Sequence, residues 1–318
     1  MNARHKVTLL TLCGLLLSCR EDSVRDRQSA LSANALSGDA GATCIPLDTV
    51  DSLPDGVDED CDGEVDEDVD FRPSSCPAGS NVIEGTRGND VLNGTSGADC
   101  ILGYGGDDTL SGGAGNDFIA GGPGNDSINT GSGQDVVYGG ADDDSVDARS
   151  SALSILHGGP GNDTMSGGNI DTEYGDDGDD ILHGGKGRAT VYGGNGDDTI
   201  TGGNQLTYLY GEDGNDTIIA GSGPTGLYGG RGNDTLTAGT NRSTLRGGDG
   251  NDTLTGGTNV DALYGDACHD LILPSNGGDT VLGGTGVDAC PTDATECELS
   301  STAAGSCSVD ADCAAQEL

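Results

Sequence analysis

The chain lacks the residues from which a large globular core is built. It contains no Trp and only two Phe among 318 residues, and hydrophobic residues of all kinds make up 33%. Basic residues are also scarce, because 13 Lys and Arg stand against 54 Asp and Glu, for a formal net charge of −41. An ordinary single core is therefore excluded for this chain length. Nucleic acid is not expected as a partner, since phosphate binding requires clustered Lys and Arg.

The chain also lacks the signatures of common hydrolases. It has no H-E-x-x-H zinc site, no G-x-S-x-G nucleophile elbow and no C-x-x-C pair. Beyond residue 18 the only His are His157, His183 and His269, so zinc is a weak interpretation. We expect no enzymatic activity, because the remaining sequence leaves no room for a catalytic domain of ordinary size.

Glycine and acidic residues are present in excess. The chain has 59 Gly among 318 residues, against a usual frequency of ~7%. A self-repelling chain of this composition stays disordered in water unless repetition or a bound cation replaces the missing core. Two classes remain: a disordered acidic tail, or a repeat protein that folds around cations.

The amino terminus predicts export. A basic start at Arg4 to Lys6 precedes the apolar run Val7 to Leu17, which is too short to span a bilayer and has the length of a signal-peptide core. The run ends in Leu-Leu-Ser-Cys at residues 16–19, which resembles the lipobox of bacterial lipoproteins and implies acylation of Cys19. The alternative is an ordinary secretory signal. We expect residues 1–18 to be a lipoprotein signal peptide, residues 19–43 a flexible disordered tether, and the protein to lie in the cell envelope, anchored to the outer membrane or exposed at the surface.

An acidic segment with Cys residues, 44–84, contains a candidate cation loop. Carboxylates stand at positions 1, 3, 5 and 9 of this loop and Gly at position 6, as in D-x-[DN]-x-[DN]-G calcium loops; the candidate ligands are Asp58, Asp60, Asp62 and Asp66. Val69 replaces the Glu of a true EF-hand at position 12. The string also resembles the metal-binding motif of MopE-related bacterial surface proteins, which implies copper. Oxygen ligands alone favour Ca²⁺, and the remaining alternative is a solvated acidic linker.

A nine-residue unit dominates the rest of the chain. Residues 112–120 read GGAGNDFIA and residues 121–129 read GGPGNDSIN. From Gly85 to Pro291 the sequence divides into 23 units, and the register holds because a ten-residue unit at 148–157 is offset by an eight-residue unit at 167–174. The unit G-G-x-G-x-D-x-U-x is similar to the calcium-binding repeat of the repeats-in-toxin (RTX) family.

This resemblance implies an all-β fold, a parallel β-roll over residues 85–291 that Ca²⁺ stabilises. Each unit then pairs a six-residue loop with a three-residue strand, two units make one coil, and the residue at position 8 points inward. In the RTX roll, Ca²⁺ is held by the position-6 Asp and by backbone carbonyls. Coils stacked about 4.8 Å apart bring unpaired carboxylates close enough to repel by about 1 kcal/mol each in water, so we expect folding to require Ca²⁺.

Odd and even units differ at position 6, and the two sets are expected on opposite edges of the roll. All twelve odd units have Asp there: Asp90, Asp108, Asp126, Asp144, Asp163, Asp180, Asp198, Asp216, Asp234, Asp252, Asp270 and Asp288. Even units have Asp99, Asp117 and Asp135, then Ala189, Thr207, Thr225 and Ser243, with Asp returning only at Asp261 and Asp279. We expect one nearly continuous calcium row on the odd edge and a second row confined mostly to the first even loops.

Position 9 of the even units is a Tyr in six coils. These are Tyr138, Tyr174, Tyr192, Tyr210, Tyr228 and Tyr264, with His157 and Arg246 in the gaps. One interpretation is a stacking ladder that stabilises the sheet. The other is an aromatic strip that contacts a polysaccharide or another cell-surface molecule.

The chain has eleven Cys, and export permits disulfides. We expect a capping loop between Cys290 and Cys297 in a Cys-containing tail that covers residues 292–318. Cys44, Cys61 and Cys76 are expected to pair among themselves or with Cys100 or Cys268.

These observations predict a calcium-binding, lipid-anchored surface protein with a structural or adhesive role, in contact with the membrane through its lipid alone. The alternative is an accessory, non-catalytic module of an enzyme or export system. The amino-terminal lipobox argues against the carboxyl-terminal type I export signal found in most RTX proteins.

Overall fold

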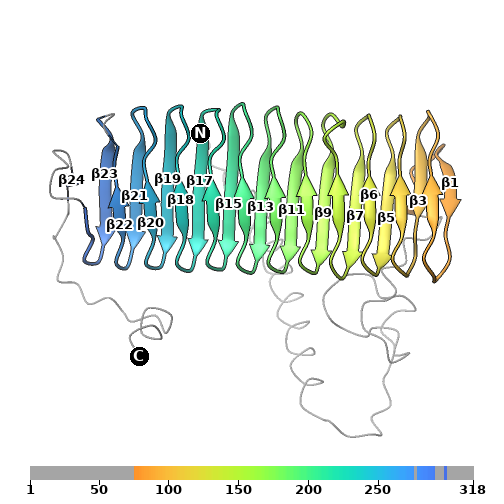
Figure 1. The fold of residues 1–318 in the computed structure, drawn as a ribbon, viewed down its shortest axis with the longest axis horizontal. Coiled ribbons are helices and arrows are strands. Elements are labelled where there is room, and N and C mark those ends of the chain that lie inside the picture. The colour runs from red at the N-terminus through yellow and green to blue at the C-terminus, as the bar shows by residue number, and fades with distance from the viewer. Residues whose placement is uncertain (1–74, 276–277, 291–296, 299–318) are drawn as a thin grey trace, which may run out of the picture. The chain divides into compact units, whose positions relative to one another are not determined.

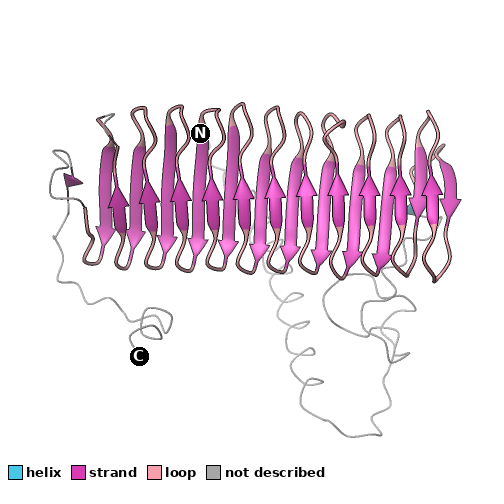
Figure 2. Cartoon of the chain, in the orientation of Figure 1, coloured by secondary structure: helices cyan, strands magenta, loops and turns pink. Residues whose placement is uncertain are grey.

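The computed structural model of the chain describes residues 75–275, 278–290 and 297–298. Two parallel β-sheets face each other, and successive strands alternate between them, so that each coil adds one strand to each sheet (Figure 1). In the described part of the chain, strands are joined by short loops along two edges (Figure 2). The expected all-β parallel roll is confirmed.

Sheet A contains thirteen strands in the order in which they follow along the chain. They are β1 (Asn81–Glu84), β3 (Asp99–Leu102), β5 (Phe118–Pro123), β7 (Val136–Ala141), β9 (Ile155–Pro160), β11 (Thr172–Asp177), β13 (Thr190–Asn195), β15 (Thr207–Asp213), β17 (Thr225–Arg231), β19 (Ser243–Asp249), β21 (Ala262–Ala267), β23 (Thr280–Thr285) and β24 (Cys297–Glu298).

Sheet B contains eleven shorter strands. They are β2 (Val91–Asn93), β4 (Thr109–Ser111), β6 (Ser127–Asn129), β8 (Ser145–Asp147), β10 (Thr164–Ser166), β12 (Ile181–His183), β14 (Thr199–Thr201), β16 (Thr217–Ile219), β18 (Thr235–Thr237), β20 (Thr253–Thr255) and β22 (Leu271–Leu273). Three-residue strands are as the repeat predicts. Most strands of sheet A are longer because pairing continues through the first residues of the next unit, as where Asp213 of β15 pairs with Arg231 of β17.

The strand register follows the repeat and absorbs its two irregular units. Most partners are 18 residues apart, as Thr217 and Thr235 are. Val136 pairs with Ile155, one residue late, and Ile155 then pairs with Thr172, one residue early. The ten-residue and eight-residue units therefore cancel as predicted, and the later coils return to register.

The core consists of two facing columns of aliphatic side chains. The aliphatic position-8 residues of both sheets form one buried cluster, which includes Leu110, Ile128, Ile200, Ile218, Leu236 and Leu254 from sheet B and Ile119, Val137, Val191, Leu209, Leu227, Leu245 and Leu263 from sheet A. All of these were expected to point inward. The columns are thin, so burial is shared by every coil and no single coil holds a core of its own.

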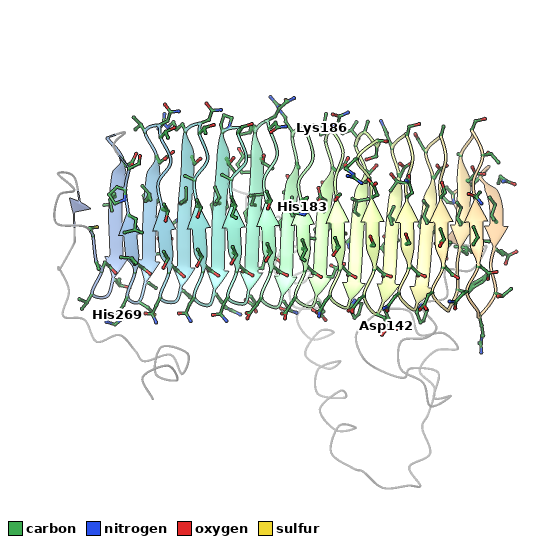
Figure 3. All side chains as sticks on the ribbon, in the orientation of Figure 1. Asp142, His183, Lys186 and His269 are labelled. Carbon is green, nitrogen blue, oxygen red and sulfur yellow. A yellow bond between two sulfur atoms is a disulfide. The ribbon has the colours of Figure 1, made fainter. Side chains whose placement is uncertain are left out.

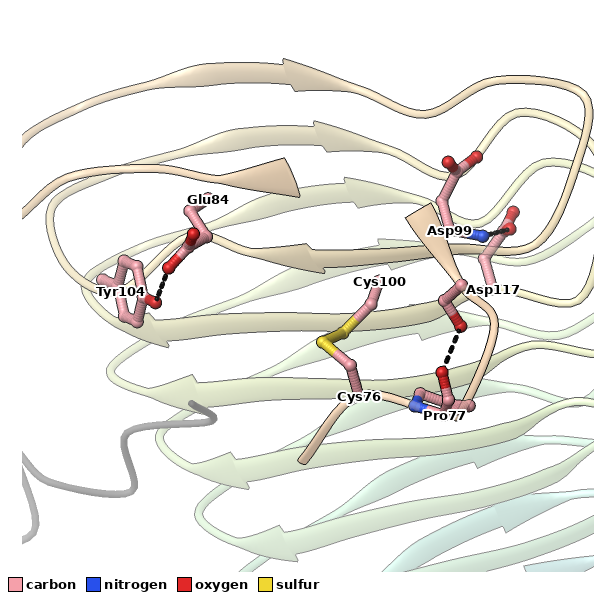
Figure 4. The surroundings of a disulfide bond; sticks show 8 residues. Cys76, Pro77, Glu84, Asp99, Cys100, Tyr104 and Asp117 are labelled. Atoms are coloured by element: carbon pink, nitrogen blue, oxygen red, sulfur yellow. Dashed lines mark hydrogen bonds between the residues drawn. A yellow bond between two sulfur atoms is a disulfide. The ribbon is translucent and has the colours of Figure 1, made fainter. Parts of the chain in front are cut away.

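A disulfide covers the outer face of sheet A near the amino-terminal end of the roll. Cys76 is bonded to Cys100 of β3 (Figure 4), one of the pairings left open by the sequence. Cys100 and Leu102 form a second apolar cluster with Ala120, and Cys76 packs against it. Because Cys100 and Ile101 point to opposite faces and both are fully buried, β3 is covered on its outer face as well as on its inner one.

The carboxyl-terminal end continues sheet A. The short strand β24 pairs in parallel with β23, with Cys297 opposite Val281. Cys268 and Cys290 are each disulfide-bonded. The expected loop between Cys290 and Cys297 spans residues 291–296, which lie outside the described part of the chain.

No helix within the described residues is long and apolar enough to cross a membrane. The expected signal peptide, the tether and most of the acidic segment fall within residues 1–74, and most of the tail falls within residues 299–318; both ranges lie outside the described part.

The Tyr column of sheet A forms a stacked ladder. From Tyr138 through His157 to Tyr228, consecutive ring centroids are 4.5–5.0 Å apart and the rings are within 11° of parallel. The ring faces are thus turned toward each other. A sugar ring stacks on an open aromatic face, so this geometry favours the stabilising interpretation of the column.

Both gaps in the Tyr column are filled by a side chain with an acidic partner. His157 lies 3.0 Å from Asp176, and Arg246 donates two hydrogen bonds to Asp266 while its guanidinium lies 5.6 Å from the ring centroid of Tyr264. Asp176 and Asp266 both have positive φ values, 76° and 77°, at position 2, where the repeat usually places Gly. Asp176 and Asp266 each make a side-chain contact with the residue that interrupts the Tyr column, from a backbone conformation that favours Gly.

We predict that replacing Tyr192 and Tyr210 together by Ser lowers the thermal midpoint of the Ca²⁺-loaded protein, because each stacked contact contributes ~0.5–1.5 kcal/mol. Differential scanning calorimetry measures the shift. Tyr208, an exposed ring of the same strand β15, is the matched control, and Tyr208→Ser should change the midpoint much less. Equal shifts for the two variants would contradict a ladder.

Candidate metal-binding loops

Each loop of the odd units places one Asp at the start of a sheet B strand. In the coil built by β5 and β6, Asp126 directly precedes β6. Gly122 and Gly124 have φ values of +105° and +123°, which favour Gly. A Cβ on Gly121 would collide with Asp126 Oδ2 and with the carbonyl oxygen of Gly139 in the next coil. The loop therefore brings a carboxylate oxygen and a backbone carbonyl oxygen toward the same point.

The odd and even loops lie on opposite edges of the roll, as predicted. In Figure 3, Asp142 and His269 of odd units mark the lower edge, and Lys186 of an even unit marks the upper edge. We call these the odd edge and the even edge.

The Asp residues of the odd edge form one unbroken ladder. The backbone N–H of each Asp donates to Oδ1 of the Asp one coil later, from Asp90 to Asp288, over distances of 2.7–3.2 Å. Oδ1 of each Asp from Asp108 to Asp288 thus accepts a backbone hydrogen bond. The ladder orients every carboxylate in the same way and leaves Oδ2 directed at the carbonyl of the next coil.

Oδ2 has no hydrogen-bond partner in ten consecutive odd-edge Asp. The ten are buried side chains: Asp108, Asp126, Asp144, Asp163, Asp180, Asp198, Asp216, Asp234, Asp252 and Asp270. A buried carboxylate oxygen that faces only other acceptors is costly. Such an arrangement is stable when a proton or a cation lies between the oxygens.

Burial raises the pKa of these carboxyl groups. It is the largest cause of a pKa of about 7 for Asp126, about 9 for Asp144 and about 8 for Asp198. The hydrogen bond from the neighbouring backbone N–H opposes this rise, and neighbouring Asp carboxylates add to it. Without a cation, many of these groups therefore hold protons near neutral pH.

The even edge repeats this arrangement only at its start. Asp117 and Asp135 are buried and have an unpartnered Oδ2. In Asp99, by contrast, Oδ1 accepts from Asn81 Nδ2 at 2.8 Å and Oδ2 from the backbone N of Thr95 at 2.6 Å. Burial raises the pKa of Asp99, but these hydrogen bonds outweigh it and the pKa lies below its usual value.

The other terminal Asp residues resemble Asp99. Oδ2 of Asp90 accepts from Thr86, Oδ2 of Asp261 from the backbone N of Gly257, and Oδ2 of Asp279 from Ser275. Position-6 Asp residues are therefore of two kinds, those with a free buried oxygen and those satisfied by their own loop.

Hydroxyl groups replace carboxylates in the later even loops. Thr207, Thr225 and Ser243 each donate to the carbonyl oxygen two residues earlier in the same loop, at 2.8, 3.0 and 3.2 Å. These carbonyls belong to position 4 of the unit. In these three loops a side-chain donor satisfies a backbone acceptor, so no cation is needed there.

The sequence-based account of the even edge is wrong at one position. Asp was expected to be absent between Asp135 and Asp261, yet Thr172 pairs with Thr190, which places Asp171 at position 6 of the eight-residue unit. Asp171 is buried, and its Oδ1 accepts from the backbone N of Ser154 at 2.9 Å. A one-residue deletion inside its loop hid it from the repeat pattern; counting back from the strand would have found it.

Among the residues that the structure describes, no three His, Cys, Asp or Glu side chains gather into one metal-binding cluster. Each odd-edge loop offers a position-6 carboxylate beside backbone carbonyls, as the RTX resemblance implies. The candidate ligands Asp58, Asp60, Asp62 and Asp66, and the lipidation site Cys19, lie outside the described residues.

Comparison with protein families agrees with this geometry. The model of the RTX calcium-binding nonapeptide repeat (4 copies) matches more than half of the chain, at residues 78–110, 111–146, 154–169, 174–205, 208–224, 228–263 and 246–281. No curated protein matches the sequence. The repeated loops, the buried carboxylate ladder and the family match together show that the chain belongs to the RTX family of calcium-binding nonapeptide-repeat proteins, whose repeats bind Ca²⁺.

Proposed function

We propose that the chain is a calcium-assembled rod that is anchored through a lipid on Cys19 and serves a structural or adhesive role at the surface of a bacterial cell. The observation that carries the proposal is the unbroken row of ten buried odd-edge carboxylates, each with an unpartnered oxygen. Such a row has no catalytic use on its own and provides one cation ligand per coil. RTX proteins are typically extracellular or secreted, which agrees with a surface location.

We assign the calcium ligands within this proposal as follows. The position-6 Asp of the odd edge and of the first three even loops each contribute a carboxylate, and backbone carbonyls of adjacent coils complete an all-oxygen site suited to a hard cation. The support is strongest for the ten odd-edge Asp residues and for Asp117 and Asp135. Asp90, Asp99 and Asp288 stand at the ends of these rows. Asp58, Asp60, Asp62 and Asp66 are assigned a separate Ca²⁺ from sequence alone.

Calcium binding and folding are coupled in this proposal by the cost of burying the carboxylates. At neutral pH each buried odd-edge Asp must either be protonated or bind a cation. A divalent cation between coils supplies the positive charge. The unfolded chain has no preformed site for it, so the cation binds only the folded chain. The free energy of cation binding therefore stabilises the fold. The three hydroxyl loops of the even edge have no position-6 carboxylate and therefore add no cost of this kind.

The regularity of the roll favours a structural role at the cell surface over the role of an accessory module of an enzyme or export system. In the described residues the outward Tyr rings are stacked on one another, which favours a stiff scaffold. An adhesive function would then reside in other parts of the surface.

We predict that the chain without its signal peptide gives a β-rich far-UV circular dichroism spectrum in millimolar Ca²⁺ and the spectrum of an unfolded chain in EGTA at about pH 8, because the unpaired carboxylates oppose burial. Identical β-rich spectra in the two conditions would exclude the coupling.

We further predict that acid replaces calcium. An Asp whose folded pKa is about 6 to 9 contributes stability that is fully present below its unfolded pKa of ~3.9 and is lost as pH rises through the folded pKa. The calcium-free protein should therefore be more stable at about pH 5 than at about pH 8, which circular dichroism with thermal melting will measure. Greater stability at the higher pH would contradict the protonated ladder.

Calcium stoichiometry tests the ligand assignment. Asp216→Asn should lower the number of Ca²⁺ bound per chain in equilibrium dialysis, because it removes a ligand from the middle of the odd row. Thr207→Ala, in the neighbouring even loop, should leave that number unchanged, because its loop carries no carboxylate. A lower count for Thr207→Ala with an unchanged count for Asp216→Asn would place calcium on the even edge and contradict the assignment.

Lipid anchoring is tested in a bacterial host by Cys19→Ala. We predict that the native chain incorporates radiolabelled palmitate and sediments with membranes, whereas the variant does neither. Membrane association that persists in the variant would rule out the anchor.

A further inference from the structure

One core position of sheet A holds a carboxyl group. Glu173 of β11 occupies position 8, between Leu156 of β9 and Val191 of β13. Its side chain is fully buried, and neither Oε1 nor Oε2 has a hydrogen-bond partner. Every other described coil has an aliphatic side chain in this column, so Glu173 is an exception that packing does not explain.

Glu173 brings an oxygen to the place that a ladder Asp occupies in other coils. A Cβ on Gly167, the first residue of its loop, would collide with Glu173 Oε1. In the odd loops the same position would collide with Oδ2 of the Asp, as at Gly121. In the even loops without a carboxylate no side-chain oxygen is near: a Cβ on Gly202 would meet Gly221 N at 2.9 Å and Leu209 Cδ1 at 3.2 Å, and one on Gly184 would meet Val191 Cγ2 at 3.3 Å. Glu173 therefore places a carboxylate oxygen where the odd loops have Oδ2 of their position-6 Asp, although Glu173 itself stands at position 8.

Both carboxylate oxygens of Asp171, the position-6 residue of this loop, already accept hydrogen bonds. Its Oδ1 accepts from the backbone N of Ser154, and its Oδ2 accepts from Ser151 Oγ at 3.0 Å and from the backbone N of Gly168. It nevertheless places a second negative charge close to Glu173. The basic residue of the preceding loop, Arg149, is exposed and paired with Asp147, so among the described residues no ion pair neutralises these two acids.

Further oxygens come from the preceding ten-residue loop. The carbonyl oxygens of Ala148 and Ser151 and the hydroxyl of Ser151 lie 2.5, 2.6 and 2.7 Å from the position that a Cβ on Gly168 would take. On the other side, the next coil turns the backbone N of Gly185 toward Gly167, at 3.3 Å from its Cβ position, where calcium-type loops turn a carbonyl. The carboxylate-free loop of Gly202 likewise turns a backbone N, that of Gly221, toward this place at 2.9 Å. At Gly167 and Gly168 the backbone acceptors therefore come from the preceding loop alone.

We propose that Glu173 ligates a hard divalent cation of the Ca²⁺ type and ends the even-edge calcium row, two coils beyond Asp135. The proposal rests on the calcium rows proposed above. The position-6 pattern does not contain this site, because its carboxylate comes from the core position of the strand. A Glu side chain is one methylene longer than Asp, which lets it reach the loop from there.

The test compares Glu173→Leu and Glu173→Gln with the native chain, without the signal peptide, and counts bound Ca²⁺ by equilibrium dialysis. Both variants should bind one Ca²⁺ fewer per chain, and Glu173→Leu should lower the thermal midpoint in Ca²⁺. If Glu173 is only a buried acid, Glu173→Leu leaves the count unchanged and raises the midpoint, because Leu fills the aliphatic column. Glu173→Gln has almost the same volume, so it decides the count if the Leu variant fails to fold.

Asp216→Asn is measured alongside as the matched control. A lower count for Asp216→Asn with an unchanged count for Glu173→Gln would reject the Glu173 site and leave the calcium rows intact. Unchanged counts for both variants would reject the rows and this site together.

Discussion

The structure depends on a single repeated contact, the hydrogen bond from the backbone N–H of one Asp to Oδ1 of the Asp one coil later. This bond joins successive coils beside the backbone pairing of the two sheets, and it leaves the second carboxylate oxygen buried without a hydrogen-bond partner in ten odd-edge Asp residues. The same contact that orders the coils therefore creates the demand for a cation or a proton. The two thin aliphatic columns bury too little apolar surface to offset the cost of burying these carboxylate oxygens. The stability of the roll therefore depends also on contacts along its edges.

The two edges meet the same constraint in different ways. The odd edge keeps a position-6 carboxylate in every coil. The even edge does so only at first, and three of its later loops have a hydroxyl that donates to a carbonyl of the same loop. Under the ligand assignment proposed above, the odd edge requires cations along its whole length and the even edge requires them only in part. Outside the sheet, the stacked rings of sheet A add a stabilising contact that needs no ion.

Most of the fold could be predicted because each inference depended only on the type of residue at one position of the nine-residue unit. Ile218 and Leu209 were placed in the core by position 8 alone, and the pairing of Ile155 with Thr172 followed from counting residues. Predictions failed where a loop changed length. Asp171 was overlooked because a deletion displaced it within its unit, and the sequence could not separate Asp117 from Asp99, whose oxygens differ only in the donors that Asn81 and Thr95 bring to Asp99.

The sequence by itself determined the repeat, the parallel all-β architecture, the inward columns and the edge on which each Asp lies, because these follow from a fixed period along the chain. Only the tertiary structure decided which carboxylate oxygens lack a partner, that Cys76 bonds Cys100, that the Tyr rings cover one another, and that Glu173 reaches a loop from a core position. These features are contacts between different coils or between a strand and its loop, and they depend on side-chain direction and on the donors present nearby, which spacing alone does not specify.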